Sequence, residues 1–192
     1  MPIPRLIPQE CTLLIIDVQV KLLPDILHGE RMARRCAFMA QVASRLDIPV
    51  ILTEQVKRVF GPTHPAILEN LPENTPVYEK SRFSALIEPV EERLRGINRP
   101  YVIVVGMEAH ICILQTVLDL LSRKNQVFVV SDCISSGEPE QISPAFRRME
   151  QAGAIVTGSI SASYELMADS KHPAFRSLLD GVKQIRSEEN RR

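Results

Sequence analysis

The sequence predicts an α/β fold in which helices cover both faces of a mostly parallel sheet. Short apolar runs alternate with amphipathic stretches along the chain, which is the pattern of successive βαβ units. The apolar runs are continuous rather than alternating with polar residues, so they predict strands that are buried on both faces. In such a sheet a ligand site lies beyond the carboxyl ends of the strands.

Six apolar runs are predicted to be strands. The first spans residues 11–18, reads CTLLIIDV and ends close to an acid. The other five span residues 48–53, 75–79, 101–105, 126–131 and 154–157. Because β-branched residues dominate several of these runs, their composition favours strand over helix.

Helical spacing of apolar residues predicts the segments between the strands. The expected helices span residues 32–46, 87–94, 112–123, 139–152 and 173–185. Gly96 and Gly153 are interpreted as helix stop signals. Residues 59–65 form a loop rich in Gly and Pro, and a short apolar turn follows at 66–71. We expect a single domain over residues 1–192, with a frayed tail after about residue 186.

Composition and charge narrow the possible partners. The 192 residues are 45% hydrophobic, and the 23 basic residues balance the 23 acidic ones. This balance argues against nucleic acid or an anionic membrane surface as a partner. The N-terminal prolines do not fit a signal peptide, no apolar run is long enough to cross a bilayer, and the four cysteines form no CxxC pair. We therefore expect a cytoplasmic protein.

Three reactive side chains fall at or just beyond predicted strand ends: Asp17, Lys80 and Cys112. A thiol needs a proton acceptor and a positive environment to react as a thiolate, and an aspartate and a lysine supply both. Each residue also has a simpler interpretation: a packed cysteine, a loop-capping aspartate and a solvated lysine. Their shared position at strand ends favours a catalytic group.

Several motifs together resemble the isochorismatase-like cysteine hydrolase family. They are, in order, LLIIDVQ, TEQ with GPTHP, EKSRFSAL, VVGMEAHICILQT and SDCISS. The resemblance runs from about Pro8 to Phe175, and GMEAHICILQT is its most specific part. Within the family, the chain looks most like the small single-domain hydrolases related to isochorismatase-domain-containing proteins.

The resemblance implies a catalytic triad. Cys112 would be the nucleophile, Asp17 the general base and acid, and Lys80 the electrostatic support. It also implies a cis peptide between Met107 and Glu108, with an oxyanion hole formed by the backbone N–H groups of Glu108 and Cys112. The implied fold is a six-stranded parallel sheet in the order 3-2-1-4-5-6, and a homo-oligomer is expected.

Departures from the family pattern bear on the substrate. Family nicotinamidases carry a metal site after the second strand, but this chain has Thr53-Glu54-Gln55-Val56-Lys57 there and a lone His64. No metal or cofactor is therefore expected. Isochorismatases proper lack the cysteine nucleophile, so Cys112 indicates hydrolysis of a C–N bond in a small molecule. The alternative is a non-catalytic or redox-responsive oligomeric binding protein that retains the fold.

Four further residues are candidates for the substrate pocket. Gln19, two residues after Asp17, either lines the pocket, orients Asp17 or makes a loop hydrogen bond. Gln55 ends the second strand and is expected to face the site. Phe60 and Phe83 flank the predicted mouth as possible substrate walls, although most aromatic residues serve packing.

Overall fold

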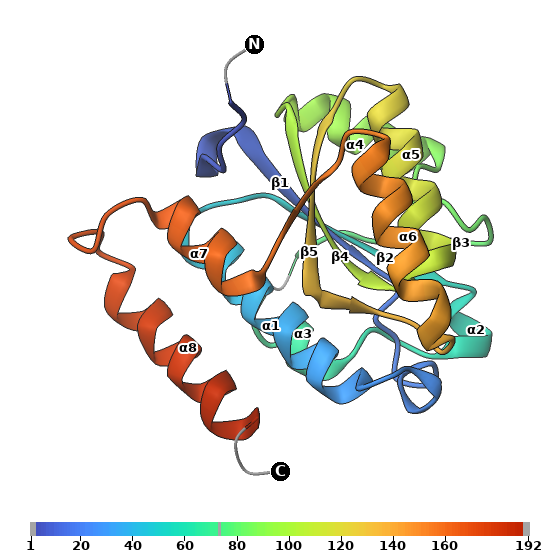
Figure 1. The fold of residues 1–192 in the computed structure, drawn as a ribbon, viewed down its shortest axis with the longest axis horizontal. Coiled ribbons are helices and arrows are strands. Elements are labelled where there is room, and N and C mark those ends of the chain that lie inside the picture. Colours follow the sequence, from blue (N-terminus) through green and yellow to red (C-terminus); the bar gives the residue numbers. More distant parts are fainter. Residues whose placement is uncertain (1–2, 73, 190–192) are drawn as a thin grey trace.

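A computed structural model describes residues 3–72 and 74–189 (Figure 1). Its six strands form one parallel sheet in the order β3-β2-β1-β4-β5-β6, which confirms the expected order. The strands are β1 (Cys11–Ile16), β2 (Val50–Gln55), β3 (Val77–Lys80), β4 (Tyr101–Met107), β5 (Gln126–Ser135) and β6 (Ile155–Thr157).

Helices cover both faces of the sheet, so the molecule has three layers (Figure 1). Helices α1, α3, α7 and α8 lie on one side, and α4, α5 and α6 lie on the other. The α-helices are α1 (Gly29–Arg45), α2 (Lys57–Phe60), α3 (Pro65–Leu68), α4 (Glu88–Ile97), α5 (Leu114–Ser122), α6 (Pro139–Gln151), α7 (Ser159–Met167) and α8 (Phe175–Glu189). Three short helical turns are η1 (Pro8–Glu10), η2 (Leu23–Asp25) and η3 (Ala109–Ile113). Within the described ranges, no helix is both long enough and apolar enough to cross a membrane.

The central strands bury both of their faces in two separate apolar cores. Leu13 and Ile15 of β1 pack in the core beneath α1, whereas Leu14 and Ile16 pack in the core beneath α5. This division follows from the strand geometry, because successive side chains point to opposite faces. A continuous apolar run is therefore what a central strand of this sheet requires.

A glycine allows β1 and β4 to come together near the carboxyl ends of these strands. Gly106 has φ +125°, and a Cβ built on it would lie 2.0 Å from the carbonyl oxygen of Ile16 on β1. No side chain fits at that distance. Gly106 therefore fixes how close the end of β4 lies to the end of β1.

Several element ends differ from the expected ones, for local reasons. Strand β1 ends at Ile16 rather than at residue 18, because Asp17 takes a left-handed conformation with φ 54°. Strand β5 continues past residue 131 to Ser135 through an irregular register against β4. Helix α5 begins at Leu114 rather than at Cys112, because a π-helical turn precedes it.

Other differences concern the helices. Gly96 does not end α4; the helix runs to Ile97, and Asn98 caps it in the left-handed conformation. Helix α8 continues to Glu189, beyond the expected start of a frayed tail, and residues 190–192 lie outside the described ranges.

Helix α7 was not predicted at all. The carboxylate of Asp132 on β5 accepts hydrogen bonds from the backbone N–H and hydroxyl of Ser159 at its start, a tertiary cap that no local pattern reveals.

Replacing Gly106 with alanine is expected to lower the free energy of unfolding by more than about 2 kcal/mol, because the new Cβ meets the Ile16 carbonyl at a positive φ. Gly96→Ala is the matched control. It has open space around its Cβ position and lies within helix α4, so we expect no loss and a gain of up to about 1 kcal/mol. Urea unfolding of both variants measures the difference. Equal stabilities would contradict the assigned role of Gly106.

Candidate active site

The three candidate catalytic side chains meet at the carboxyl edge of the sheet. Lys80 Nζ lies 2.6 Å from Asp17 Oδ2 and 3.5 Å from Cys112 Sγ. All three residues are buried, with exposed fractions of 1% for Asp17, 3% for Lys80 and 7% for Cys112. The ammonium thus lies in contact with both a carboxylate and a thiol, away from bulk water.

The strand register brings these residues together. Ile16, the last residue of β1, pairs with Thr53 of β2 and with Gly106 of β4. Asp17 follows directly, so its carboxylate emerges between the ends of the two neighbouring strands. Lys80 is the last residue of β3, the strand beyond β2. This is the edge at which parallel α/β sheets place their ligands.

Polar groups surround the lysine on its other sides. Lys80 Nζ donates hydrogen bonds to Gln55 Oε1 at 2.6 Å and to the backbone carbonyls of Arg82 at 3.1 Å and Phe83 at 3.0 Å. A buried ammonium is costly unless its donors are satisfied, and these acceptors satisfy them. The loop after β3 therefore wraps back around the side chain that ends this strand.

The same burial changes the acid–base properties of the site. Burial is the main cause that raises the pKa of Asp17, and the adjacent Lys80 charge and the Thr53 hydroxyl partly oppose it. Burial and the charge of Asp17 raise the pKa of Cys112 to about 12, although Lys80 acts in the opposite direction. The resting thiol therefore keeps its proton at neutral pH. The carboxylate of Asp17, which burial makes more basic than an ordinary aspartate, lies beside the thiol and can accept that proton.

Cys112 lies in the π-helical turn η3, not in the first turn of an α-helix as expected. The peptide between Met107 and Glu108, expected to be cis, is cis in the structure. The backbone carbonyl of Glu108 accepts hydrogen bonds from the N–H groups of Ile111 and Ile113, both at 3.1 Å. π-Helical turns are rare and often occur at functional sites.

The carboxylate of Glu108 also anchors this turn to a neighbouring strand. Its Oε2 accepts a hydrogen bond of 2.8 Å from the N–H of Gly137, just after β5. His110 Nδ1 lies 2.7 Å from the hydroxyl of Ser136 in the same segment. Two side chains of the turn are thus tied to the residues that follow β5.

Gln19 makes structural hydrogen bonds in the loop after β2, and its predicted place in the substrate pocket stays a prediction. Its Nε2 donates to the carbonyls of Gln55 at 3.1 Å and Gly61 at 2.6 Å, and its Oε1 accepts the N–H of Gln55 at 2.7 Å. The side chain is fully buried. Of the alternatives considered for it, the loop hydrogen bond is the one that the structure contains.

The other three pocket candidates lie in different surroundings. The Gln55 side chain reaches the site, where its amide bridges Lys80 Nζ and the carbonyl of Ser81 at 2.9 Å. Phe83 is 54% exposed, and its backbone carbonyl accepts a hydrogen bond from Lys80 Nζ. Phe60 ends the short helix α2 and is half-buried. For both aromatic residues, a role as substrate wall stays a prediction.

The segment after β2 is held by structural contacts. Glu54 accepts hydrogen bonds from the N–H and hydroxyl of Thr63 and pairs with Lys57 Nζ at 3.0 Å. His64 Nε2 lies 3.6 Å from a carboxylate oxygen of Glu30. Within residues 3–72 and 74–189, no three His, Cys, Asp or Glu side chains are grouped in a way that could hold a metal ion.

Thr53 contacts the site, although the sequence did not predict this role. The hydroxyl of Thr53 donates a 2.8 Å hydrogen bond to Asp17 Oδ1, which leaves Oδ2 for the lysine. Thr53 pairs with the last residue of β1, so only the strand register places it there. A threonine at the end of an apolar run carries no such signal by itself.

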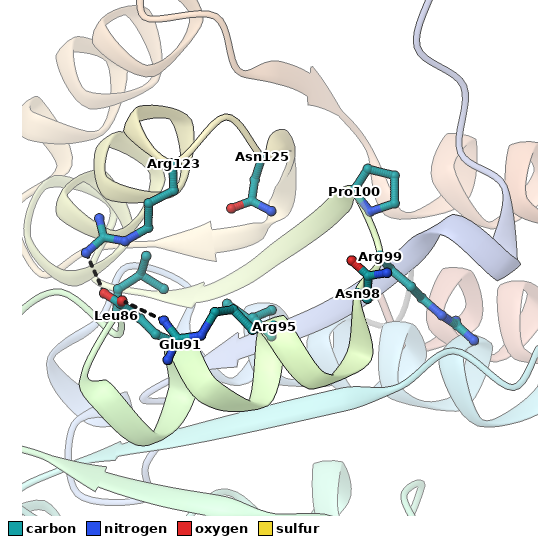
Figure 2. Close-up of a pocket in the computed structure, with 9 residues that line it drawn as sticks. Leu86, Glu91, Arg95, Asn98, Arg99, Pro100, Arg123 and Asn125 are labelled. Atoms are coloured by element: carbon teal, nitrogen blue, oxygen red, sulfur yellow. Dashed lines mark hydrogen bonds and ion pairs between the residues drawn. The ribbon is translucent and has the colours of Figure 1, made fainter.

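A pocket of about 490 Å³ lies elsewhere, between α4 and the end of α5 (Figure 2). It is lined by Leu86, Glu91, Leu94, Arg95, Asn98, Arg99, Pro100, Arg123 and Asn125. Pro100 precedes β4 and Asn125 precedes β5, so the pocket opens near the amino ends of these strands, opposite Cys112. Glu91 pairs with both Arg95 and Arg123 there. Its lining contains no cysteine, serine or threonine, and Asp17, Lys80 and Cys112 lie elsewhere, so we do not assign catalysis to it.

Replacing Gln19 with leucine is expected to lower the free energy of unfolding by about 3 kcal/mol, because it leaves the Gln55 N–H and the Gly61 carbonyl without their partner. Gln126→Leu, which removes one 3.4 Å contact to the Gly153 carbonyl, should cost less than about 1 kcal/mol. Denaturant unfolding compares them. A Gln19→Leu protein as stable as the native one would contradict this structural role.

Comparison with known proteins identifies the family. The model of the isochorismatase domain matches residues 11–161. Relatives include a secreted isochorismatase effector of Phytophthora sojae, 36% identical over 94% of this chain and 88% of its own length, and isochorismatase domain-containing protein 2 of Xenopus laevis, 36% identical over 85% and 79%. A solved structure of MAR1 ribonuclease from Caenorhabditis elegans is 38% identical with a TM-score of 0.89, over 93% of this chain and 92% of that one. The chain belongs to the isochorismatase family of hydrolases.

Proposed function

We propose that the protein is a cysteine-dependent hydrolase that cleaves the C–N bond of a small amide or carbamoyl compound. The observation that carries the proposal is the buried contact of Lys80 with both Asp17 and Cys112. A nucleophile, a proton acceptor and a cation in mutual contact are the parts that acyl transfer requires. A role in packing alone would not need a buried charge pair beside a thiol.

In the first half of the proposed reaction, Cys112 transfers its proton to Asp17 while its sulfur attacks the substrate carbonyl. The N–H groups of Glu108 and Cys112 stabilise the resulting oxyanion. Asp17 then returns the proton to the nitrogen as the C–N bond breaks. Ammonia or an amine leaves, and the acyl group remains on the sulfur as a thioester.

In the second half, water hydrolyses the thioester. Asp17, now a carboxylate again, takes a proton from the water as its oxygen attacks the carbonyl carbon. The bond to sulfur breaks, and Asp17 gives its proton to the departing thiolate of Cys112. Lys80 keeps its charge throughout, so it balances the negative charge as that charge moves between oxygen and sulfur.

Two alternative functions were weighed against this proposal: a ribonuclease and a non-catalytic binding protein. The Caenorhabditis elegans neighbour is named a ribonuclease, but the basic and acidic residues of this chain are equal in number and give no support for an RNA groove. A non-catalytic or redox-responsive binding protein is the second alternative. It does not account for the cost of burying Lys80 and Asp17 next to a thiol.

Location and assembly remain expectations. We propose a reducing compartment such as the cytoplasm, because Cys11, Cys36, Cys112 and Cys133 are all free and buried. One relative, from Phytophthora sojae, is named as a secreted protein. We also propose a homo-oligomer, as the resemblance to the family implies.

Replacing Cys112 with alanine is expected to reduce turnover by at least about 10⁴-fold while leaving the fold intact. A screen of small amides for ammonia release, with single-stranded and structured RNA in parallel, supplies the substrate. Cys11→Ala, which alters another buried cysteine, should keep full turnover. Intact mass spectrometry should detect an acyl adduct on the native protein and none on Cys112→Ala. Cysteine-dependent RNA cleavage without ammonia release would overturn the proposed bond class.

Turnover should fall at acidic pH as Asp17 becomes protonated. Because burial raises the pKa of Asp17, activity is present above that raised value and is lost as the pH falls through it, at a midpoint above the ordinary ~3.9. Thr53→Val removes a hydrogen bond that favours the carboxylate, so its midpoint should lie higher still. Profiles of kcat/KM against pH measure both midpoints. An acid limb at or below the ordinary aspartate value would contradict the role of Asp17.

A further inference from the structure

The loop that follows β3 is attached to the helix that follows the nucleophile. Residues 81–86 run from Lys80 toward α4 and pass along α5. Two of their carbonyls, those of Arg82 and Phe83, accept hydrogen bonds from Lys80 Nζ. The position of this loop therefore helps to fix the ammonium, together with Asp17 and Gln55.

One hydroxyl links the loop to the backbone of the nucleophile. Thr116 Oγ1 on α5 donates a 2.6 Å hydrogen bond to the carbonyl of Cys112 and accepts a 2.8 Å hydrogen bond from the N–H of Ala85. Thr116 and Ala85 are both fully buried. A buried hydroxyl that both donates and accepts cannot be replaced by an apolar group without leaving a backbone group unsatisfied.

A second hydroxyl attaches the same loop one turn further along α5. Ser84 Oγ donates a 2.6 Å hydrogen bond to Asp119 Oδ2 and accepts the N–H of Leu86 at 3.2 Å. Ser84 is buried, with 4% of its surface exposed. The loop is thus attached to α5 at two neighbouring residues: Ala85 bonds to Thr116, and Ser84 bonds to Asp119.

We propose that Thr116 and Ser84 are positioning residues that clamp the loop of residues 81–86 to helix α5 and so hold the Lys80 ammonium against the thiol of Cys112. The inference rests on the proposed function, because it assigns the reactivity of Cys112 to the placement of Lys80. The clamp joins the cation and the nucleophile through the backbone: Lys80 to the loop carbonyls, the loop to Thr116, and Thr116 to Cys112.

The clamp matters because charge–thiol interactions weaken with distance. Lys80 is the cation that opposes burial and the Asp17 charge at Cys112. If the loop of residues 81–86 moves away, the Lys80 ammonium loses the carbonyls of Arg82 and Phe83 as hydrogen-bond acceptors. The ammonium can then move away from the sulfur of Cys112. The thiolate then loses part of its stabilisation, so a smaller fraction of the thiol reacts at a given pH.

The rate at which iodoacetamide alkylates Cys112, followed by peptide mass spectrometry as a function of pH, tests the clamp without a known substrate. Thr116→Val should slow the alkylation about tenfold at about pH 8, equal to an upward shift of about one pH unit in its profile. Ser84→Ala should slow it about threefold. Thr116→Ser keeps the hydroxyl and should restore the native profile.

Thr12→Val is the matched control, because Thr12 is a fully buried threonine on β1 whose hydroxyl has no partner within the described residues. It should leave the alkylation profile unchanged. Circular dichroism establishes that each variant is folded, and Ser84→Ala provides the test if Thr116→Val does not fold. Folded Thr116→Val or Ser84→Ala with a native profile, or an equal shift in Thr12→Val, would overturn the clamp. A native protein whose Cys112 does not react would instead count against the proposed hydrolase.

Discussion

The contact between Lys80 and Asp17 is the interaction on which the site depends. Both side chains are almost completely withdrawn from water, and their charged atoms are 2.6 Å apart. Removing two charges from water costs several kcal/mol per ion, and the attraction between them offsets that cost only when further hydrogen bonds complete both groups. Thr53 completes the carboxylate, while Gln55 and two loop carbonyls complete the ammonium.

The order of the strands explains why residues from several elements are needed to hold Lys80 against Asp17. Asp17 leaves β1 and Lys80 leaves β3, and these strands are not neighbours, because β2 lies between them. Adjacent strands are about 4.8 Å apart, so the lysine must reach across roughly 10 Å of sheet edge. The residues at the end of β2 fill that gap, and Thr53 and Gln55 each bond to one member of the pair. Gly106 sets the other side of the site by letting β4 approach β1.

Much of this arrangement could be predicted from the order of residues along the chain. Continuous apolar runs indicated the strands, and the positions of Asp17, Lys80 and Cys112 after strand ends indicated a shared edge of the sheet. The resemblance to a family added the strand order and the cis peptide. These features depend on local composition and on motifs, which a single sequence displays directly.

The remaining features depend on contacts between distant segments. Thr53, Thr116 and Ser84 are ordinary polar residues whose roles arise from strand register and from the path of one loop. Gln19 stands two residues from Asp17, yet its partners are backbone groups more than thirty positions away in the chain. Helix α7 begins at a cap supplied by β5. No local pattern carries such information.

The 7% exposure of Cys112 has a consequence for chemical labelling. Because so little of this residue is exposed, the size of a reagent limits its access to the sulfur. Small electrophiles should therefore label this thiol more readily than aromatic maleimides or protein disulfides of equal intrinsic reactivity. The same low exposure disfavours reaction with large molecules, so a covalent probe for this protein should be small.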